Sequence, residues 1–154
     1  MIGVGERGLD HLDCLFAKFK DEVEISGILC STPESTFEKA LDLELPYFNS
    51  VEEISKDNTD AVIITTKSNK HTLFGRMMLN KGLPVLIEKP FTTNLAEAKD
   101  LTLLAKQKNT FVMVGHSEQF NPAYQEMCKM AVLPFRDLKA YRMINSPHRC
   151  RDIS

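Results

Sequence analysis

The sequence has no apolar stretch long enough to cross a membrane and no long block of basic residues. Its longest apolar runs are strand-sized, far short of the ~20 residues that a membrane helix needs. With a net charge of -2, the chain has little to attract nucleic acid or an anionic lipid surface. We therefore expect no nucleic-acid partner and no membrane partner.

Cysteine is also sparse, and no C-x-x-C pair occurs among Cys14, Cys30, Cys128 and Cys150. Scattered thiols of this kind are typical of a reducing compartment, so we expect a cytoplasmic protein. Met1 is followed at once by glycines and charges, which predicts no signal peptide. A zinc site from Cys128, His148 and Cys150 can be imagined, but the spacing matches no common ligand pattern, and we expect no metal.

What is present is ordinary for a soluble globular domain, with 43% hydrophobic and 26% charged residues. Short β-branched apolar runs alternate with longer helical patterns. The strand-like runs cover residues 23–29, 60–66, 83–87 and 110–114. The helical patterns cover residues 9–19, 71–80 (ending at Gly82) and 95–105. This alternation requires crossover connections, and so it predicts a doubly wound α/β domain with a mainly parallel sheet.

The character of the sequence changes after Asn121-Pro122. Residues 123–132 have a helical pattern, and residues 138–144 alternate as a strand with one exposed face does. The last ten residues, NSPHRCRDIS, contain no compact element of their own. We predict a first domain over residues 1–121 and only the start of a second α/β domain over residues 122–154.

Three glycines open the chain in the pattern Gly3-x-Gly5-x-x-Gly8. Between a strand and a helix, such a turn lets the backbone approach a pyrophosphate, whose charge then lies at the helix N-terminus. The pattern alone is weak evidence, because glycines in a flexible arm look the same. A helical pattern and then a strand-like run follow it, as a βαβ unit requires. Only Met1 and Ile2 precede the turn, so we expect a short central strand.

The end of the second strand bears on the choice of cofactor. A fold that prefers NAD usually places Asp or Glu there to bind the ribose 2′-hydroxyl, but Cys30 occupies this position. Ser31 and Thr32 have hydroxyls that can bind a 2′-phosphate, yet no arginine is near to pair with it. A polar loop that binds nothing is the other interpretation. The residues leave both NAD and NADP open.

Polar residues also follow the next strand. In open α/β sheets, ligands bind at the carboxyl ends of the strands, near the point where the strand order reverses. We expect Thr65, Thr66 and Lys67 to lie there. Ser68 or Asn69 is expected to cap the helix that follows.

Glu88, Lys89 and Pro90 end a further strand-like run at the same edge. A lysine there can exchange a proton with a hydroxyl under oxidation, while the neighbouring acid holds position and charge. Pro90 fixes the backbone where the strand turns, with a cis bond as one option. A surface turn with a solvated Glu–Lys ion pair is the opposing interpretation.

Four stretches together resemble the Gfo/Idh/MocA oxidoreductases, a family that includes glucose-fructose oxidoreductase and inositol dehydrogenases. They are GVGERG, TTKSNKH, VLIEKPFTT and VGHSEQFNPA. The Glu-Lys-Pro and Gly-His-x-x-x-Phe-Asn-Pro elements are more specific than the glycines, and the likeness spans nearly the whole chain. It implies an N-terminal Rossmann domain for NAD or NADP and a C-terminal α/β domain with a large open sheet.

The resemblance also implies roles for residues. Lys89 would be the catalytic group at the substrate hydroxyl. Together with the strand-end analysis, it predicts a cofactor site formed by Gly3, Gly5, Gly8, Cys30, Ser31, Thr65, Thr66, His71, Glu88, His116 and Asn121. His116 and Asn121 would lie near the nicotinamide and the domain junction. The departures from the family pattern are Cys30 for an acid, Lys67 for a common proline and Gln119 for a common arginine.

The implied activity is hydride transfer between the nicotinamide and a carbinol of a sugar, cyclitol or related polyol, which would be the small-molecule partner. Family members usually add an aspartate and a later histidine from the second domain, and residues 151–154 resemble only the lead-in to that segment. We therefore expect these residues alone to lack full activity. A non-catalytic dinucleotide-binding module or truncated remnant is the competing hypothesis. Because the second-domain sheet often packs against another subunit in this family, a homo-oligomer stays open.

Overall fold

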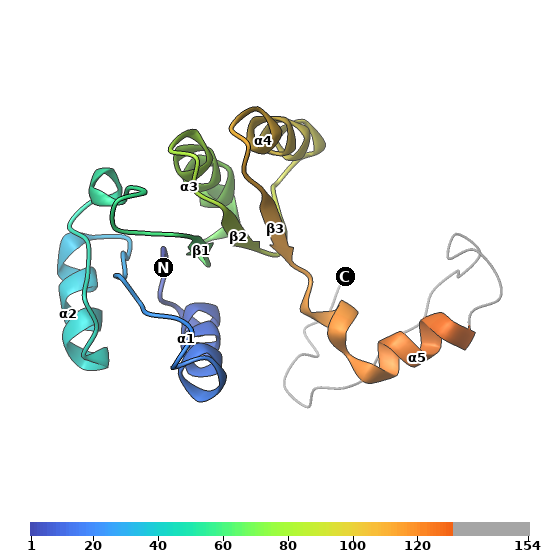
Figure 1. Cartoon of the computed structure of the whole chain (residues 1–154), viewed down its shortest axis with the longest axis horizontal. Helices are drawn as coiled ribbons and strands as arrows, with labels where there is room; N and C mark the ends of the chain where they lie inside the picture. The colour runs from blue at the N-terminus through green and yellow to red at the C-terminus, as the bar shows by residue number, and fades with distance from the viewer. Residues whose placement is uncertain (131–154) are drawn as a thin grey trace, which may run out of the picture. The chain divides into compact units, whose positions relative to one another are not determined.

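The computed structural model describes residues 1–130 (Figure 1). Contacts between Cα atoms divide the chain into two units, Met1–His116 and Ser117–Ser154. The domain boundary that we predict after Asn121 stays a prediction. No helix within residues 1–130 is long and apolar enough to cross a membrane.

The first unit is built on a parallel sheet. Its regular strands, in their order across the sheet, are β1 (Val62–Ile64), β2 (Val85–Glu88) and β3 (Val112–Gly115). Isolated parallel bridges extend the sheet beyond β1, from Ile64 to Ile2, from Ile2 to Leu29 and from Ile28 to Tyr47. The first segment of the chain therefore lies in the middle, and later segments lie outward from it on both sides. This order confirms the predicted doubly wound sheet.

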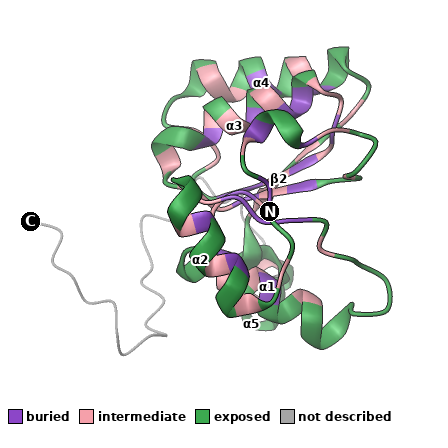
Figure 2. Ribbon diagram, turned by 90° about the vertical axis from the view of Figure 1, so that its left-hand side faces the viewer, coloured by how far each residue is buried: buried purple, intermediate pink, exposed green. Residues whose placement is uncertain are grey.

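Helices cover both faces of this sheet. They are α1 (Glu6–Lys18), α2 (Pro33–Leu43), α3 (Ser68–Asn80) and α4 (Leu95–Gln107), with a 3-10 turn, η1 (Val51–Glu53), between α2 and β1. Both views show α1 and α2 on one face and α3 and α4 on the other (Figures 1 and 2). Helices α3 and α4 pack on each other and on the regular strands.

Each face has its own apolar core. On the side of α3 and α4, the buried cluster includes Met78, Leu79 and Leu101, together with Leu29 of the sheet. On the side of α1 and α2, Leu12 and Ala40 cluster with Val4 and Ile28. Ile28 and Leu29 are neighbours in sequence but belong to different cores, because successive side chains of an extended segment point to opposite faces.

The strand predicted over residues 23–29 is wrong for most of its length. Only Ile28 and Leu29 form bridges, and Val23 is exposed, with its N–H donating to the Phe19 carbonyl oxygen. The Gly27 carbonyl accepts a hydrogen bond from the Met1 amino group at 2.6 Å. Within residues 1–130, residues 23–26 take part in no bridge of the sheet. The other strands are confirmed, with shifted ends.

Helix α2 has no counterpart among the predicted elements, although its start carries a clear local signal. The Thr32 hydroxyl accepts a hydrogen bond from the Ser35 N–H, and the Ser35 hydroxyl accepts one from the Thr32 N–H. This is a reciprocal capping box, and Pro33 follows Thr32 at the first helical position. These three residues mark a helix start that the apolar periodicity alone does not show.

The start of α3 also differs from the prediction. Ser68 and Asn69 lie inside the helix rather than capping it, and the N-cap residue, Lys67, makes no side-chain cap hydrogen bond. At the other end, α3 stops at Asn80, and Gly82 has a φ of 74°, in the left-handed region that favours glycine. The predicted helix end is therefore confirmed.

In the second unit, the described elements are η2 (Ser117–Phe120) and α5 (Pro122–Met130). The helix predicted from Ala123 is confirmed as far as Met130. The last two residues of that prediction, the strand predicted at 138–144, and His148 and Cys150 of the imagined zinc site lie outside the described residues.

Candidate functional site

The register of the sheet brings most predicted site residues to one edge. Parallel pairing places Ile2, Leu29, Ile64, Ile87 and Val114 level with one another. The next residues along these segments are Gly3, Cys30, Thr65, Glu88 and Gly115, followed on four of them by Ser31, Thr66, Lys89 and His116. They leave the carboxyl ends of parallel strands, where open α/β sheets bind ligands. Gly3 leaves the central segment, where the strand order reverses.

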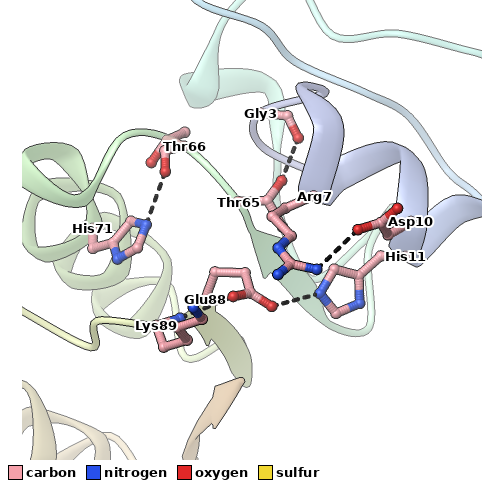
Figure 3. A network of polar contacts seen from close by, with 9 residues as sticks. All are labelled: Gly3, Arg7, Asp10, His11, Thr65, Thr66, His71, Glu88 and Lys89. Carbon is pink, nitrogen blue, oxygen red and sulfur yellow. Dashed lines mark hydrogen bonds and ion pairs between the residues drawn. The ribbon is translucent and has the colours of Figure 1, made fainter. Parts of the chain in front are cut away.

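Gly3 lies against the end of β1. Its φ is 91°, in the region that favours glycine. A β-carbon at this position would come within 2.8 Å of the Thr66 backbone nitrogen and 2.9 Å of the Thr65 carbonyl carbon. The Thr65 hydroxyl donates to the Gly3 carbonyl oxygen, as Figure 3 shows. Gly3 thus allows the turn before α1 to lie directly on β1.

Gly5 and Gly8 have contrasting surroundings at the start of α1. A β-carbon on Gly8 would come within 2.5 Å of the Gly3 carbonyl oxygen, so a small residue is needed where the helix meets the sheet. Around Gly5, no described atom lies within 4 Å of a β-carbon position. Gly5 is the N-cap of α1, and no side chain caps that end. The helix N-terminus is therefore open, as binding of a pyrophosphate requires.

His71 braces two loops at this edge. Its Nε2 lies 2.9 Å from the Thr66 carbonyl oxygen and its Nδ1 lies 2.8 Å from the Pro90 carbonyl oxygen. Both partners only accept, so a neutral ring donates to one of them and a protonated ring donates to both. The residue is 1% exposed. His71 therefore holds the end of β1 to the end of β2, and its predicted contact with the cofactor stays a prediction.

The Glu88 carboxylate makes two hydrogen bonds and has a close neighbour on β3; Figure 3 shows its contact with His11. Its Oε1 lies 3.1 Å from Nε2 of His11 on α1, and its Oε2 accepts the Lys89 backbone N–H at 3.1 Å. On the β3 side, a β-carbon on Gly115 would come within 2.8 Å of Oε1. The Glu88 side chain is only 12% exposed. The carboxylate is therefore a fixed, largely buried group.

Lys89 is exposed, and its ammonium has no hydrogen bond or ion pair within residues 1–130. The opposing interpretation, a solvated ion pair between Glu88 and Lys89, is wrong, because the carboxylate pairs with His11 and with the Lys89 backbone instead. The Lys89–Pro90 peptide bond is cis, which confirms that option. The lysine side chain thus follows a fixed acid at the edge where the glycine turn lies.

Cys30 is partly buried, and its backbone N–H donates to the Thr36 hydroxyl at 2.9 Å. Burial raises the pKa of the Cys30 thiol, although the Val4 N–H acts in the opposite direction. The thiol is therefore uncharged near neutral pH and cannot act as the ribose-binding carboxylate. The Thr32 hydroxyl is engaged in the capping box, whereas Ser31 is exposed. Ser31 is the hydroxyl that this loop leaves available to a ligand.

The last two predicted residues lie farther along the chain. His116 is exposed, and its backbone N–H donates to the Val114 carbonyl oxygen at 2.7 Å. Asn121 belongs to the second unit, where its side chain accepts the Ala123 N–H at 3.0 Å and donates to the Glu118 carboxylate at 3.1 Å. Their places near a nicotinamide stay predictions.

His11 is the site residue that the sequence analysis missed. It follows Gly8 by three positions, and residues at that spacing lie on the same helix face. Since Gly8 contacts the sheet, a polar residue at position 11 points to a partner at the strand ends. This spacing was the available signal. Within residues 1–130, no group of three or more His, Cys, Asp or Glu side chains is arranged to hold a metal ion.

The fold and this edge together define a class of protein. A doubly wound parallel sheet, with a glycine turn and an open helix N-terminus where the strand order reverses, is the architecture of dinucleotide-binding domains. Gly3, Gly5 and Gly8 each have the surroundings that this role needs.

The chain belongs to the Gfo/Idh/MocA oxidoreductase family. Residues 1–116 match the family described as an oxidoreductase family with an NAD-binding Rossmann fold. This match confirms the resemblance noted in the sequence. It also confirms, at the level of the family, the predicted class of cofactor.

Known relatives agree with this assignment. UDP-N-acetylglucosamine 3-dehydrogenase of Acidithiobacillus ferrooxidans is 29% identical over 99% of this chain and 47% of its own length. A solved structure of that enzyme has a TM-score of 0.73 over 84% of this chain and 41% of its own. Inositol 2-dehydrogenase of Corynebacterium glutamicum is 28% identical over 84% of this chain and 39% of its own length. The chain thus spans less than half the length of these relatives.

Proposed function

We propose that this chain binds NAD or NADP at the carboxyl edge of its sheet and forms the cofactor part of an oxidoreductase of sugar-like molecules. The observation that supports it best is the open N-terminus of α1 at Gly5, on the edge where Lys89 also lies. Two relatives are named as dehydrogenases of a nucleotide sugar and of inositol. We extend that substrate class, a carbinol of a sugar, cyclitol or related polyol, to this chain.

In this proposal, the backbone around Gly3, Gly5 and Gly8 holds the pyrophosphate. Cys30 and Ser31 lie at the ribose of the adenosine half, because they follow the strand next to the central segment. Thr65, Thr66, His71 and Glu88 then line the site beside the glycine turn, with His116 toward the nicotinamide. The cofactor supplies the hydride acceptor or donor when it is bound.

Lys89 would move the proton that accompanies the hydride. When the substrate carbinol is oxidised to a carbonyl, its O–H proton would pass to the Lys89 amine, and the bound cofactor would supply the hydride acceptor. In the reverse direction, the Lys89 ammonium returns the proton to the carbonyl oxygen. The fixed Glu88 carboxylate keeps the Lys89 backbone in place beside this chemistry.

The test is a titration of the 154-residue chain with NADH and NADPH, followed by nicotinamide fluorescence, and a thermal melt with each oxidised and reduced nucleotide. We expect saturable binding of at least one nucleotide and a raised midpoint of unfolding, because a ligand of the folded state stabilises it by mass action. No binding and no shift at millimolar nucleotide would contradict the proposal. Turnover of sugars and cyclitols is tested on a version of the chain extended past Ser154, because we expect these residues alone to lack full activity. Binding without turnover by that longer version would favour the competing non-catalytic module.

A further inference from the structure

We propose that His11 is a positioning residue of this site, which fixes the Glu88 carboxylate and, through it, the backbone at Lys89. This inference rests on the proposed function, because it assigns His11 to the same site. The contact joins residues from separate elements, with Nε2 of His11 on α1 lying 3.1 Å from Oε1 of Glu88 at the end of β2. Figure 3 shows the two side chains pointing toward each other.

The charge of Glu88 explains why this contact matters. The side chain is 12% exposed, and a largely buried carboxylate requires hydrogen-bond partners to compensate for lost water. A carboxylate only accepts hydrogen bonds, so the Nε2–H of His11 must donate to it. The only other partner that residues 1–130 offer the carboxylate is the Lys89 N–H. His11 is therefore the one side chain that holds Oε1.

Gly115 of β3 lies close to the same carboxylate oxygen. A β-carbon on Gly115 would lie 2.8 Å from Oε1 and 3.1 Å from the carboxyl carbon of Glu88. The carboxylate thus has α1 and β3 as near neighbours. If the His11 donor is lost, Oε1 loses its hydrogen bond, and we expect the group to turn toward water. That rotation breaks the bond from Oε2 to the Lys89 N–H and releases the peptide that sets the direction of the lysine side chain.

A purely structural role for His11 is the competing explanation, and burial argues against it. The His11 side chain is 27% exposed, and its contact with Glu88 is a polar one through Nε2. We therefore expect its contribution to come from the donor atom rather than from packed volume. Variants that keep the volume but differ in the donor separate the two explanations.

The experiment compares His11→Gln with His11→Met, which have similar length but differ in whether the side chain can donate. Asp13→Ala, an exposed position on the same helix, is the matched control. The first readout is the amide resonance of Lys89 in ¹H–¹⁵N spectra of the chain without nucleotide. We expect His11→Met and Glu88→Gln to shift the Lys89 and Gly115 amides, and His11→Gln and Asp13→Ala to leave them close to wild type.

The second readout is the affinity for whichever reduced nucleotide the wild type binds. We expect His11→Met to weaken nucleotide binding roughly tenfold, which is the size of losing one hydrogen bond to a charged group. We expect His11→Gln to keep most of the wild-type affinity, because glutamine can donate to the carboxylate. The double variant His11→Met/Glu88→Gln should bind no more weakly than Glu88→Gln alone, because both changes break the same contact.

Two results would overturn the inference. One is a Lys89 amide that does not respond to His11→Met, and the other is equal loss of affinity in His11→Gln and His11→Met. Failure of the proposed function looks different, because wild type itself would then bind neither nucleotide. In that case the amide spectra still decide whether His11 positions Glu88.

Discussion

Gly8 lies so close to Gly3 that a β-carbon at position 8 would come within 2.5 Å of the Gly3 carbonyl oxygen, whereas a β-carbon at position 5 would meet no described atom within 4 Å outside its own stretch of chain. We predict that Gly8→Ala lowers the free energy of unfolding by about 1–3 kcal/mol, the usual cost of overpacking. Gly5→Ala should change it by less than about 0.5 kcal/mol but reduce nucleotide affinity, because the added methyl group enters the space for the pyrophosphate. Urea unfolding and fluorescence titration of both variants measure these effects. Equal stability of the two variants would refute the packing argument.

The contacts of the His71 ring with two carbonyl oxygens lead to a second prediction. His71→Leu removes from a buried position the ring nitrogens that contact the Thr66 and Pro90 carbonyl oxygens, so we expect a loss of about 1–3 kcal/mol in the free energy of unfolding. Leu73 lies on the same helix and is 48% exposed, and Leu73→Ala should cost less than about 0.5 kcal/mol. Chemical denaturation of the two variants makes the comparison. A His71 variant as stable as the control would show that the two contacts contribute nothing.

Cysteine reactivity makes a third prediction. Burial raises the pKa of the Cys30 thiol, and only the thiolate reacts with alkylating reagents. Cys14, by contrast, is exposed. At pH 7 we expect iodoacetamide to modify Cys14 well before Cys30, with the rate at Cys30 rising as the pH increases. Peptide mapping by mass spectrometry follows each site separately, and preferential labelling of Cys30 at pH 7 would be inconsistent with its surroundings.

The amino group of Met1 makes the stability of the 154-residue chain depend on pH. Burial lowers its pKa from 8.0 to about 6. Between these values the unfolded chain binds more protons than the folded chain, so the free energy of unfolding rises with pH from 6 to 8. A difference of this size corresponds to roughly 2–3 kcal/mol.

Acetylation of the Met1 amino group removes its titration, which isolates this effect from the histidines. Urea unfolding at pH 6 and pH 8 should therefore show a larger rise in stability for the free amine than for the acetylated chain. The same rise in both forms would assign the pH dependence to other groups.

The two predictions that the structure overturns in the fold have a common cause. The apolar pattern of residues 23–29 suits a strand, but a strand exists only where a neighbour supplies hydrogen bonds, and among the described residues only Ile28 and Leu29 of this run form bridges. In α3, Ser68 and Asn69 suit a helix cap, but the helix begins one residue earlier in the chain than such a cap allows. Local propensity favours both features. The contacts of the folded chain determine the residue at which each element starts.

The sequence by itself determined the alternation of strands and helices, the parallel sheet, the glycine turn and the acid–lysine pair at a strand end. Each of these is a local pattern, because side-chain periodicity and backbone freedom act over a few residues. Only the tertiary structure decided that His11 pairs with Glu88, 77 positions away, that Gly115 lies beside the same carboxylate, and that His71 contacts the loops after β1 and β2. Such contacts depend on the register of the sheet and on how closely α1 packs against it. Neither can be predicted from a pattern of a few neighbouring residues.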